Sequence, residues 1–327
     1  MSELQLDGSD SGMLVVPESG VVLPAVIAEA GPEVAQRFVE FFLVGIRNRN
    51  TRGAYGLAIK QFLSWCEGRG LMFGQISPLA ISAYIEQHPG AVQTVNQHLS
   101  AIKSFFAWML LGGVVESNPA AEVKGIKYRV KVGKTPVLSD EEMRELFNSI
   151  DVSGVMGLRD RALIAVMFFS FARISAVLGM KVEDYFPKGG RRYWLRLHEK
   201  GGRYHEVPAH HKTEEFLDAY LEGAGIAEET GTPLFRSCRG RTRQVTERGL
   251  LRHDAWAMIK RRAKAAGVST AACNHTFRAS GITNYLKNGG SRDNAQKIAA
   301  HEDVRTTALY DRRDESISLD EIERIRL

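Results

Sequence analysis

The chain has 327 residues, of which 44% are hydrophobic and 25% charged, a composition typical of a globular protein with one large or two ordinary domains. It contains no apolar run long enough to span a membrane, and its N-terminus lacks the basic start and apolar core of a signal peptide. The three cysteines are scattered and odd in number, which argues against a disulfide framework and favours a reducing cytoplasm.

The charge is unevenly distributed along the chain. The net charge is +5, but residues 1–40 hold seven acids and one base, a net of −6, which leaves +11 for the rest. A basic body of this kind suits an anionic polymer such as nucleic acid. A merely solvated basic surface explains the charge alone equally well.

The first third of the chain predicts a tail followed by a helical domain. Residues 1–32 contain glycine, serine and proline without a sustained helical period, so we expect a mostly disordered tail. Residues 33–119 contain four amphipathic segments, which predict a compact helical domain. Thr51 is a candidate N-cap of the second helix, and Ser77 followed by Pro78 is a good start for the third.

Residues 120–136 have the composition of a basic linker. They combine small residues with Lys124, Lys127, Arg129, Lys131 and Lys134. Basic linkers often follow a phosphate backbone, and a solvated connector is the alternative.

A second, larger domain is expected over residues 137–327. Ser139 and Glu142 form a capping box that predicts a helix start. Residues 158–179 predict one long, buried helix, and residues 192–208 alternate as in a β-hairpin. The remainder has helical patterns, so the predicted fold class is mainly α with a small β-sheet.

Arg173 stands out on physical grounds because it lies inside the apolar run from Ala165 to Ile174. Burying an unpaired guanidinium is costly, so Arg173 needs either an acidic partner or an anionic ligand. Farther along, His275 and Arg278 lie one helical turn apart on the same face. Such a pair is weak evidence by itself, because a histidine packed in the core is the commoner outcome.

Three segments, taken together, resemble the tyrosine recombinase (phage integrase) family of site-specific DNA recombinases. They are Arg159-Asp160-Arg161-Ala162-Leu163 with Ala172-Arg173-Ile174-Ser175, then His275-Thr276-Phe277-Arg278, and then Ala300-His301 with Tyr310. The spacings of 23 residues from Arg278 to His301 and 9 from His301 to Tyr310 also match the family. The resemblance covers about residues 34–315 and includes the helices before the linker.

The resemblance implies a two-domain DNA clamp. A helical core-binding domain of the SAM-like type, residues 33–119, would be joined by the basic linker 120–136 to a catalytic domain, residues 137–327. Lys200, between Glu199 and Gly201, matches the hairpin that carries the family's catalytic lysine.

The resemblance also implies roles for six side chains. Arg173 and Arg278 would present planar forks of donors to the non-bridging phosphate oxygens, and His301 would add a donor. Two arginines can replace a metal ion as an electrostatic clamp, so we expect no metal and no other cofactor.

Tyr310 would be the nucleophile that forms a 3′-phosphotyrosyl link to DNA. A phenol with a pKa near 10 is about one part in a thousand ionised at pH 7, so it needs help. His275 is the candidate proton acceptor, and Lys200 is the candidate acid that protonates the departing 5′-oxygen.

This chain departs from the family around two of these residues. The family usually has Gly-Leu before the first arginine and an acid three residues after it, where this chain has Phe171-Ala172 and Ala176. That acid normally supports the arginine, so we expect either that Asp184 or Glu183 substitutes for it or that the site is looser. Ala299-Ala300 replaces Leu-Gly before the second histidine.

The expected partner is double-stranded DNA with an inverted-repeat recombination site, bound by two protomers and by four in the synaptic complex. We expect a cytoplasmic, nucleoid-associated bacterial protein that does not bind membranes. Residues 317–327 have the pattern of an amphipathic helix that docks on a neighbour or packs on its own domain. The basic residues expected to meet phosphates are Arg236, Arg239, Arg241, Arg243, Lys260, Arg261 and Arg262.

Other functions fit the sequence less well. The spacing of His198, His205, His210 and His211 fits no standard zinc finger, and Cys273 lies one residue too close to Arg278 for a cysteine phosphatase. A type IB topoisomerase that relaxes supercoils and a non-catalytic DNA-binding regulator remain as alternatives. The complete set of catalytic residue types argues against the regulator.

Overall fold

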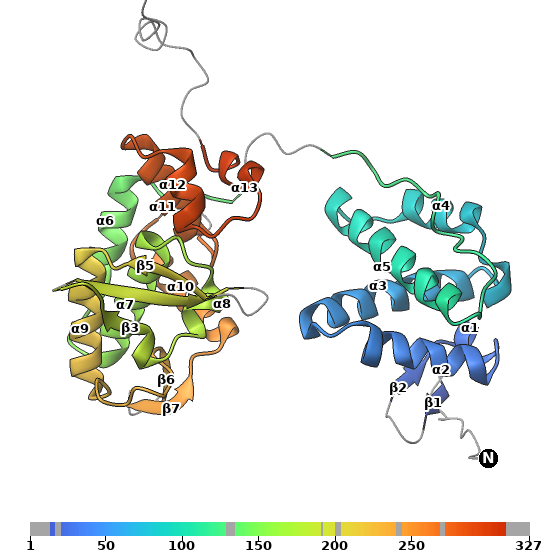
Figure 1. The fold of residues 1–327 in the computed structure, drawn as a ribbon, viewed down its shortest axis with the longest axis horizontal. Coiled ribbons are helices and arrows are strands. Elements are labelled where there is room, and N and C mark those ends of the chain that lie inside the picture. Colours follow the sequence, from blue (N-terminus) through green and yellow to red (C-terminus); the bar gives the residue numbers. More distant parts are fainter. Residues whose placement is uncertain are drawn as a thin grey trace, which may run out of the picture. The chain divides into compact units, whose positions relative to one another are not determined.

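The computed structural model describes residues 14–16, 21–128, 135–190, 192–199, 204–239, 244–268 and 272–311. The chain divides into two compact units, Met1–Arg129 and Val130–Leu327 (Figure 1). Both are mainly helical and the second contains small sheets, which confirms the predicted fold class. Among the described helices, none is both long enough and apolar enough to cross a membrane.

The first unit is a helical bundle preceded by a short hairpin. The elements are β1 (Leu14–Val16), β2 (Val21–Leu23), α1 (Ala25–Ala28), α2 (Pro32–Glu40), the π-helical turn η1 (Phe41–Gly45), α3 (Arg49–Glu67), the 3-10 turn η2 (Phe73–Gln75), α4 (Pro78–Gln87) and α5 (Val92–Leu111). α3 packs on α5, and aromatic rings from η1, η2 and α5 meet edge to face in the core. The Ser77 hydroxyl caps α4 through the amide of Ala80, as predicted.

Two expectations for the first unit are wrong in detail. α3 begins before Thr51, because the Asn48 side chain accepts hydrogen bonds from the amides of Asn50 and Thr51 and is the N-cap. The expected tail, residues 1–32, includes packed structure, since Leu23, Val26 and Ile27 are buried in the core. Two strands of three residues each and one helical turn are too short to show a period, so the sequence pattern did not reveal them. Residues 1–13 and 17–20 lie outside the described residues.

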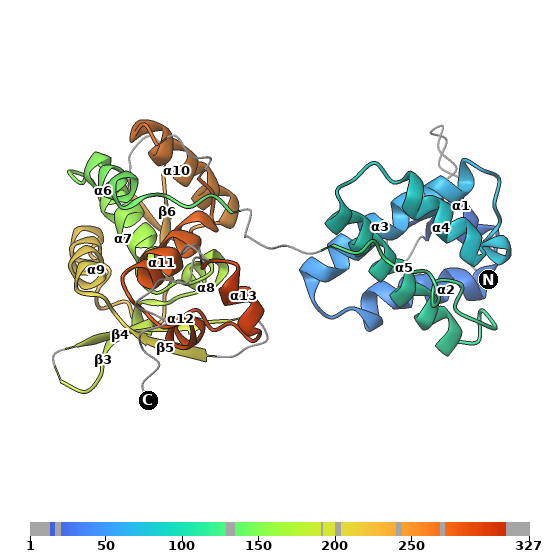
Figure 2. The same cartoon turned by 90° about the horizontal axis from the view of Figure 1, so that it is seen from above.

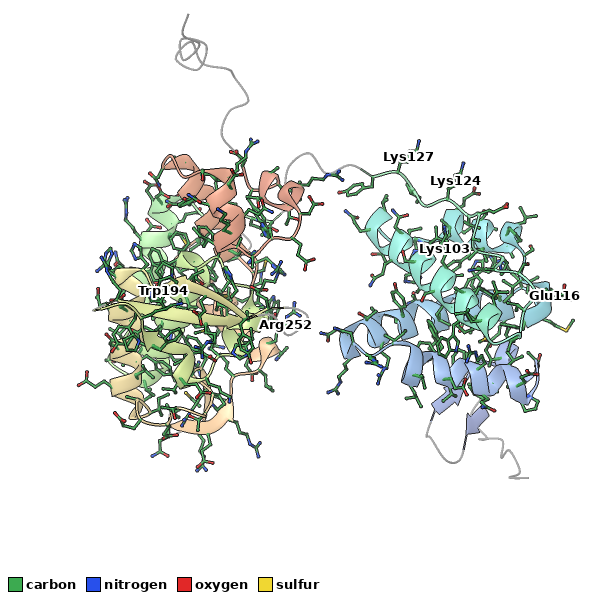
Figure 3. All side chains as sticks on the ribbon, in the orientation of Figure 1. Lys103, Glu116, Lys124, Lys127, Trp194 and Arg252 are labelled. Carbon is green, nitrogen blue, oxygen red and sulfur yellow. The ribbon has the colours of Figure 1, made fainter. Side chains whose placement is uncertain are left out.

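The start of the expected linker packs on the first unit. Ala120 and Val123 are buried, and the Asn96 side chain holds the backbone of Ile126 through two hydrogen bonds of 2.9 Å. Lys124 and Lys127 point away from the helices (Figure 3). Their side chains are therefore available to an anionic partner.

The second unit arranges helices around a three-stranded antiparallel sheet. The elements are α6 (Asp140–Ser149), α7 (Val155–Phe169), α8 (Ile174–Leu178), η3 (Val182–Asp184), β3 (Tyr185–Pro187), β4 (Tyr193–His198), β5 (Tyr204–Pro208), α9 (His211–Ala224), β6 (Arg236–Cys238), β7 (Val245–Gly249), α10 (Arg252–Ala265), α11 (Thr276–Lys287), α12 (Arg292–Ile298) and α13 (Val304–Ala308). β4 is the central strand between β3 and β5, and β6 pairs with β7 separately. α11 lies in the middle of this unit and packs on α7 and α12 (Figure 2).

The second unit confirms two sequence predictions and corrects a third. The capping box of Ser139 and Glu142 is formed, and the predicted hairpin is β4–β5. The single long helix predicted over residues 158–179 is wrong: α7 ends at Phe169 and α8 starts at Ile174. Phe171, at the break, has a left-handed φ of 55°. An apolar run that is buried on all sides gives no period to reveal such a break.

Candidate active site

The described catalytic candidates come from four segments that meet in the second unit. Arg173 is the N-cap of α8, His275 is the N-cap of α11, and Arg278 lies in the first turn of α11. His301 follows α12, and Tyr310 follows α13. Burial first, and then the positive charges of both arginines, lower the pKa values of both histidines, so these four side chains share one electrostatic environment. Lys200 lies outside the described residues.

Arg278 is the most enclosed of these side chains, with 2% of its surface exposed. Its guanidinium donates to the backbone oxygen of Phe171 and, at 2.7 Å, to that of Ala299. Burial and the charge of Arg173 lower the pKa of Arg278 to about 10, while electrostatic interactions with Tyr310 and Glu199 oppose that shift. Arg278 therefore stays charged at neutral pH, although its partners are uncharged.

Two strained backbone positions aim the carbonyls that hold Arg278. Phe171 (φ 55°) and Ala300 (φ 47°) are the non-glycine residues with positive φ among the described residues. Phe171 supplies one acceptor itself, and Ala300 directly follows the other acceptor, Ala299. The left-handed conformation is costly for side chains with a Cβ, and strain of this kind is concentrated at functional sites.

A glycine lets α11 approach this bent segment closely. A Cβ on Gly281, one turn after Arg278, would lie 2.0 Å from the backbone oxygen of Phe168 and 2.9 Å from the ring of Phe171. No side chain fits in that space, so the close packing of α11 against the end of α7 requires glycine at position 281.

Arg173 is held in a different way from Arg278. Its Nη1 lies 2.5 Å from Oε2 of Glu199, and the Arg173 side chain is 35% exposed. The expected acids are engaged elsewhere: Asp184 accepts from the backbone amide of Lys181 at 2.9 Å, and Glu183 pairs with the Lys181 side chain. The expectation that Asp184 or Glu183 supports Arg173 is therefore wrong.

His301 is a buried and neutral imidazole. Burial, followed by the charges of Arg278 and Arg173, lowers its pKa to about 3. Nδ1 lies 2.8 Å from the Thr307 hydroxyl, and the ring stacks on Tyr310 at 5.8 Å between centroids and 7° between planes. When Thr307 donates to Nδ1, the neutral ring carries its proton on Nε2 and can donate it to an oxyanion.

Tyr310 is fixed at its backbone while its phenol reaches the arginine. Its amide donates to Thr307, and its carbonyl accepts a 3.0 Å hydrogen bond from the Thr283 hydroxyl on α11. The phenol lies near enough to the Arg278 guanidinium to oppose the lowering of the Arg278 pKa.

His275 is surrounded by positive charge. Desolvation first, and then Arg252, Arg278 and Arg173, lower its pKa below the usual value. The neutral ring can accept a proton. Arg252, the first residue of α10, was not singled out from the sequence (Figure 3). The signal that identifies it is a cation in the first helical turn, which the helix dipole disfavours unless an anion binds there.

Two arginines expected at phosphates are structural. Arg236 is 3% exposed and pairs with Glu229 at 2.5 Å. Arg262 lies 2.8 Å from Asp160, a fully buried carboxylate that also pairs with Arg159. The Arg262 pair ties α10 to α7, because a buried carboxylate needs charged partners, and Arg159 on α7 also donates to the backbone oxygen of Arg236 on β6 at 2.8 Å. By contrast, Arg239 and Arg261 are exposed, and Arg241 and Arg243 lie outside the described residues.

The histidines near the hairpin have separate partners. His198 pairs with Asp184 at 3.0 Å, His205 bonds the backbone oxygen of Ile298 at 2.9 Å, and His210 stacks on Phe169. Within the described segments, no three His, Cys, Asp or Glu side chains are grouped so that they could hold a metal ion.

Residues 136–316 match the phage integrase family. The chain is 30% identical over 285 residues to tyrosine recombinase XerD of Ralstonia nicotianae, which covers 85% of this chain and 89% of the relative. The structure resembles the XerH site-specific recombinase bound to palindromic difH substrate in a post-cleavage complex, with a TM-score of 0.66, 17% identity and coverage of 85% and 84% of the two chains. It also resembles a lambda integrase tetramer bound to a Holliday junction, with a TM-score of 0.63, 17% identity and coverage of 94% and 95%.

Proposed function

Since the chain belongs to the phage integrase family and is a tyrosine-type site-specific recombinase, we propose that it cuts and rejoins DNA through a covalent bond between Tyr310 and phosphate. The observation that carries this proposal is the stacking of the Tyr310 ring on the neutral imidazole of His301, close to buried Arg278. This arrangement supports the proposed roles of Tyr310 as nucleophile and of Arg278 and His301 as oxyanion donors.

In the proposed reaction, the Tyr310 oxygen attacks a DNA phosphorus and the 5′-oxygen of deoxyribose leaves. The phenolic proton passes to neutral His275, and Lys200 gives a proton to the departing 5′-oxygen. The product is a 3′-phosphotyrosyl link similar in energy to the bond that was broken. A second 5′-hydroxyl can therefore reverse the step without ATP.

Charge that develops on the phosphate is proposed to be stabilised by fixed donors. Arg173 and Arg278 would contact the non-bridging oxygens, and Nε2 of His301 would donate to one of them. The arginines remain protonated throughout, so the proposed step needs no metal ion.

The proposed substrate is double-stranded DNA with an inverted-repeat site, bound by two protomers and paired in a tetramer. The palindromic substrate of the similar XerH complex and the tetramer of the similar lambda integrase support this proposal. Exposed Lys124, Lys127, Arg239 and Arg261 supply positive charge for phosphate contacts.

Trapping covalent adducts from sheared genomic DNA of the source organism tests the proposal. After denaturation, the wild-type protein should retain DNA, and sequencing that DNA should recover one site with inverted arms. Tyr310→Phe should bind the recovered duplex but retain no DNA after denaturation. Adduct formation should persist in excess EDTA.

Two results would contradict the proposal. An adduct that survives in Tyr310→Phe would assign the nucleophile elsewhere. Adducts spread over unrelated sequences, with relaxation of any supercoiled plasmid, would favour a topoisomerase.

A further inference from the structure

The ion pair between Arg173 and Glu199 joins two residues that are 26 positions apart and on different elements. Glu199 directly follows β4, and its side chain is 9% exposed. A carboxylate so little exposed is stabilised by a charged partner, which Arg173 provides. The pair is therefore a built part of the second unit rather than a chance surface contact.

The backbones at both ends of this ion pair are firmly held. The Arg173 carbonyl accepts hydrogen bonds from the amides of Ala176 and Val177, which fixes the backbone at the start of α8. β4 pairs with strands on both sides, and His198, next to Glu199, is in register with Tyr204. Both side chains thus start from fixed positions.

The long Arg173 side chain nevertheless has to be oriented. Within the described residues, the Arg173 guanidinium donates a hydrogen bond to Glu199. Ala176, one turn along α8, has no carboxylate that could hold it. Glu199 takes Nη1 alone, and the side chain stays 35% exposed. The other guanidinium donors remain free of Glu199 and open to a ligand.

Electrostatics give the carboxylate a second effect. The charge of Arg173 lowers the pKa of Arg278, and the charge of Glu199 acts in the opposite direction. Two arginines that must share one phosphate repel each other before the phosphate arrives. A carboxylate on the more exposed arginine offsets that repulsion and leaves the buried one to its carbonyl partners.

We propose that Glu199 is the positioning residue of Arg173: it holds Nη1 so that the remaining donors of the guanidinium face the DNA phosphate. This inference rests on the proposed function, because it assumes that Arg173 contacts the phosphate. Glu199 itself touches neither DNA nor the reacting atoms.

The test measures single-turnover cleavage and DNA affinity separately, on the duplex recovered by adduct trapping. Glu199→Ala should lower the cleavage rate at saturating DNA by up to about 100-fold, the scale of a misplaced catalytic group. Its dissociation constant should stay unchanged or become smaller, because a negative charge near the DNA is removed. Glu199→Gln keeps an acceptor of the same shape and should fall between Glu199→Ala and the wild type.

A matched control and a double mutant make the result specific. Glu206→Ala removes the same charge from the same sheet at a residue that pairs with Lys188 and Arg196, and should cleave like the wild type. In an Arg173→Ala background, adding Glu199→Ala should change the rate less than about twofold, because the two residues act as a unit.

Several outcomes would overturn the inference. Glu199→Ala could cleave at the wild-type rate or faster, which would make the carboxylate neutral or a competitor of the phosphate. It could also cost as much in the Arg173→Ala background as alone, which would place its action elsewhere. If Glu199→Ala does not fold, the isosteric Glu199→Gln decides the same questions. Failure of the proposed function is a separate result, because the wild type would then form no Tyr310-dependent adduct.

Discussion

The two arginines of the candidate site are held by different chemistry. Arg278, on α11, is buried and bound by two backbone carbonyls, which are aimed by residues in left-handed conformations. Arg173, beside the sheet, is half-exposed and bound by one carboxylate. A carbonyl leaves the full positive charge in place, whereas a carboxylate offsets it. Arg278 thus provides a fixed and fully charged donor. The positive charge of Arg173 is partly offset by its carboxylate partner.

The largest expected effect comes from Lys200, the proposed general acid. If Lys200 protonates the departing 5′-oxygen, Lys200→Ala should slow cleavage of normal DNA by ~10²–10⁴-fold, the usual loss for a general acid. When sulfur replaces the 5′-bridging oxygen of the substrate, the leaving group departs as a thiolate and needs no proton. Lys200→Ala should approach the wild-type rate on that substrate, whereas Arg173→Ala should be slow on both. Equal defects of Lys200→Ala on both substrates would remove the lysine from the acid role.

Replacing Arg278 should damage both chemistry and stability. Arg278→Ala removes an oxyanion donor, worth ~10²–10³-fold in rate, and leaves two buried carbonyls unpaired at about 1–3 kcal/mol each. The double variant Arg173→Ala/Glu199→Ala should lose activity with little change in melting temperature, because it leaves no carboxylate unpaired and the Arg173 side chain is partly exposed. Cleavage assays and thermal melts on both variants measure the difference. Similar melting temperatures for the two variants would contradict the proposed difference in how Arg278 and Arg173 are held.

The lowered pKa of His301 predicts that the folded protein loses stability in acid. His301 has a folded-state pKa of about 3, below its ordinary 6.5. Between these values the unfolded chain takes up a proton that the folded protein does not, so stability should fall as the pH drops from about 6.5 towards 3. His301→Gln should reduce that loss in melts at pH 7.5 and pH 5. His253→Gln, at an exposed histidine, is the control and should follow the wild type.

The smallest effect should be a gain in stability. Ala300→Gly relieves a left-handed alanine, which costs roughly 1–2 kcal/mol, and adds glycine's chain entropy of roughly 0.5–1 kcal/mol. We expect a net stabilisation of about 0.5–1 kcal/mol by denaturant melts. Ala308→Gly, in the exposed and right-handed α13, should instead destabilise by a similar amount. A loss of stability in Ala300→Gly would show that its methyl group has a packing role.

Sequence reasoning succeeded where the signal is local. The capping box of Ser139 and Glu142, the Ser77-Pro78 helix start and the β4–β5 hairpin depend on residues within a few positions of one another. The three segments that resemble the tyrosine recombinase family were recognised in the same way, from short motifs at fixed spacing.

Sequence reasoning failed where the answer depends on long-range packing. The break between α7 and α8 is hidden by a run of apolar residues, and the left-handed φ of Phe171 has no sequence signature. The partner of Arg173 lies 26 residues away on a strand end, so no local pattern points to Glu199. Likewise, an exposed arginine and the inward-facing Arg236 look alike until the fold pairs one of them with an acid.

Tyr310, close to Arg278, is proposed to be the nucleophile that attacks the DNA phosphorus. Mass spectrometry of the trapped adduct, after nuclease and trypsin digestion, tests it directly. The tryptic peptide of residues 306–312, which contains Tyr310 and no other tyrosine, should carry the mass of a 3′-linked nucleotide. An unmodified 306–312 peptide together with a nucleotide on another residue would contradict the account.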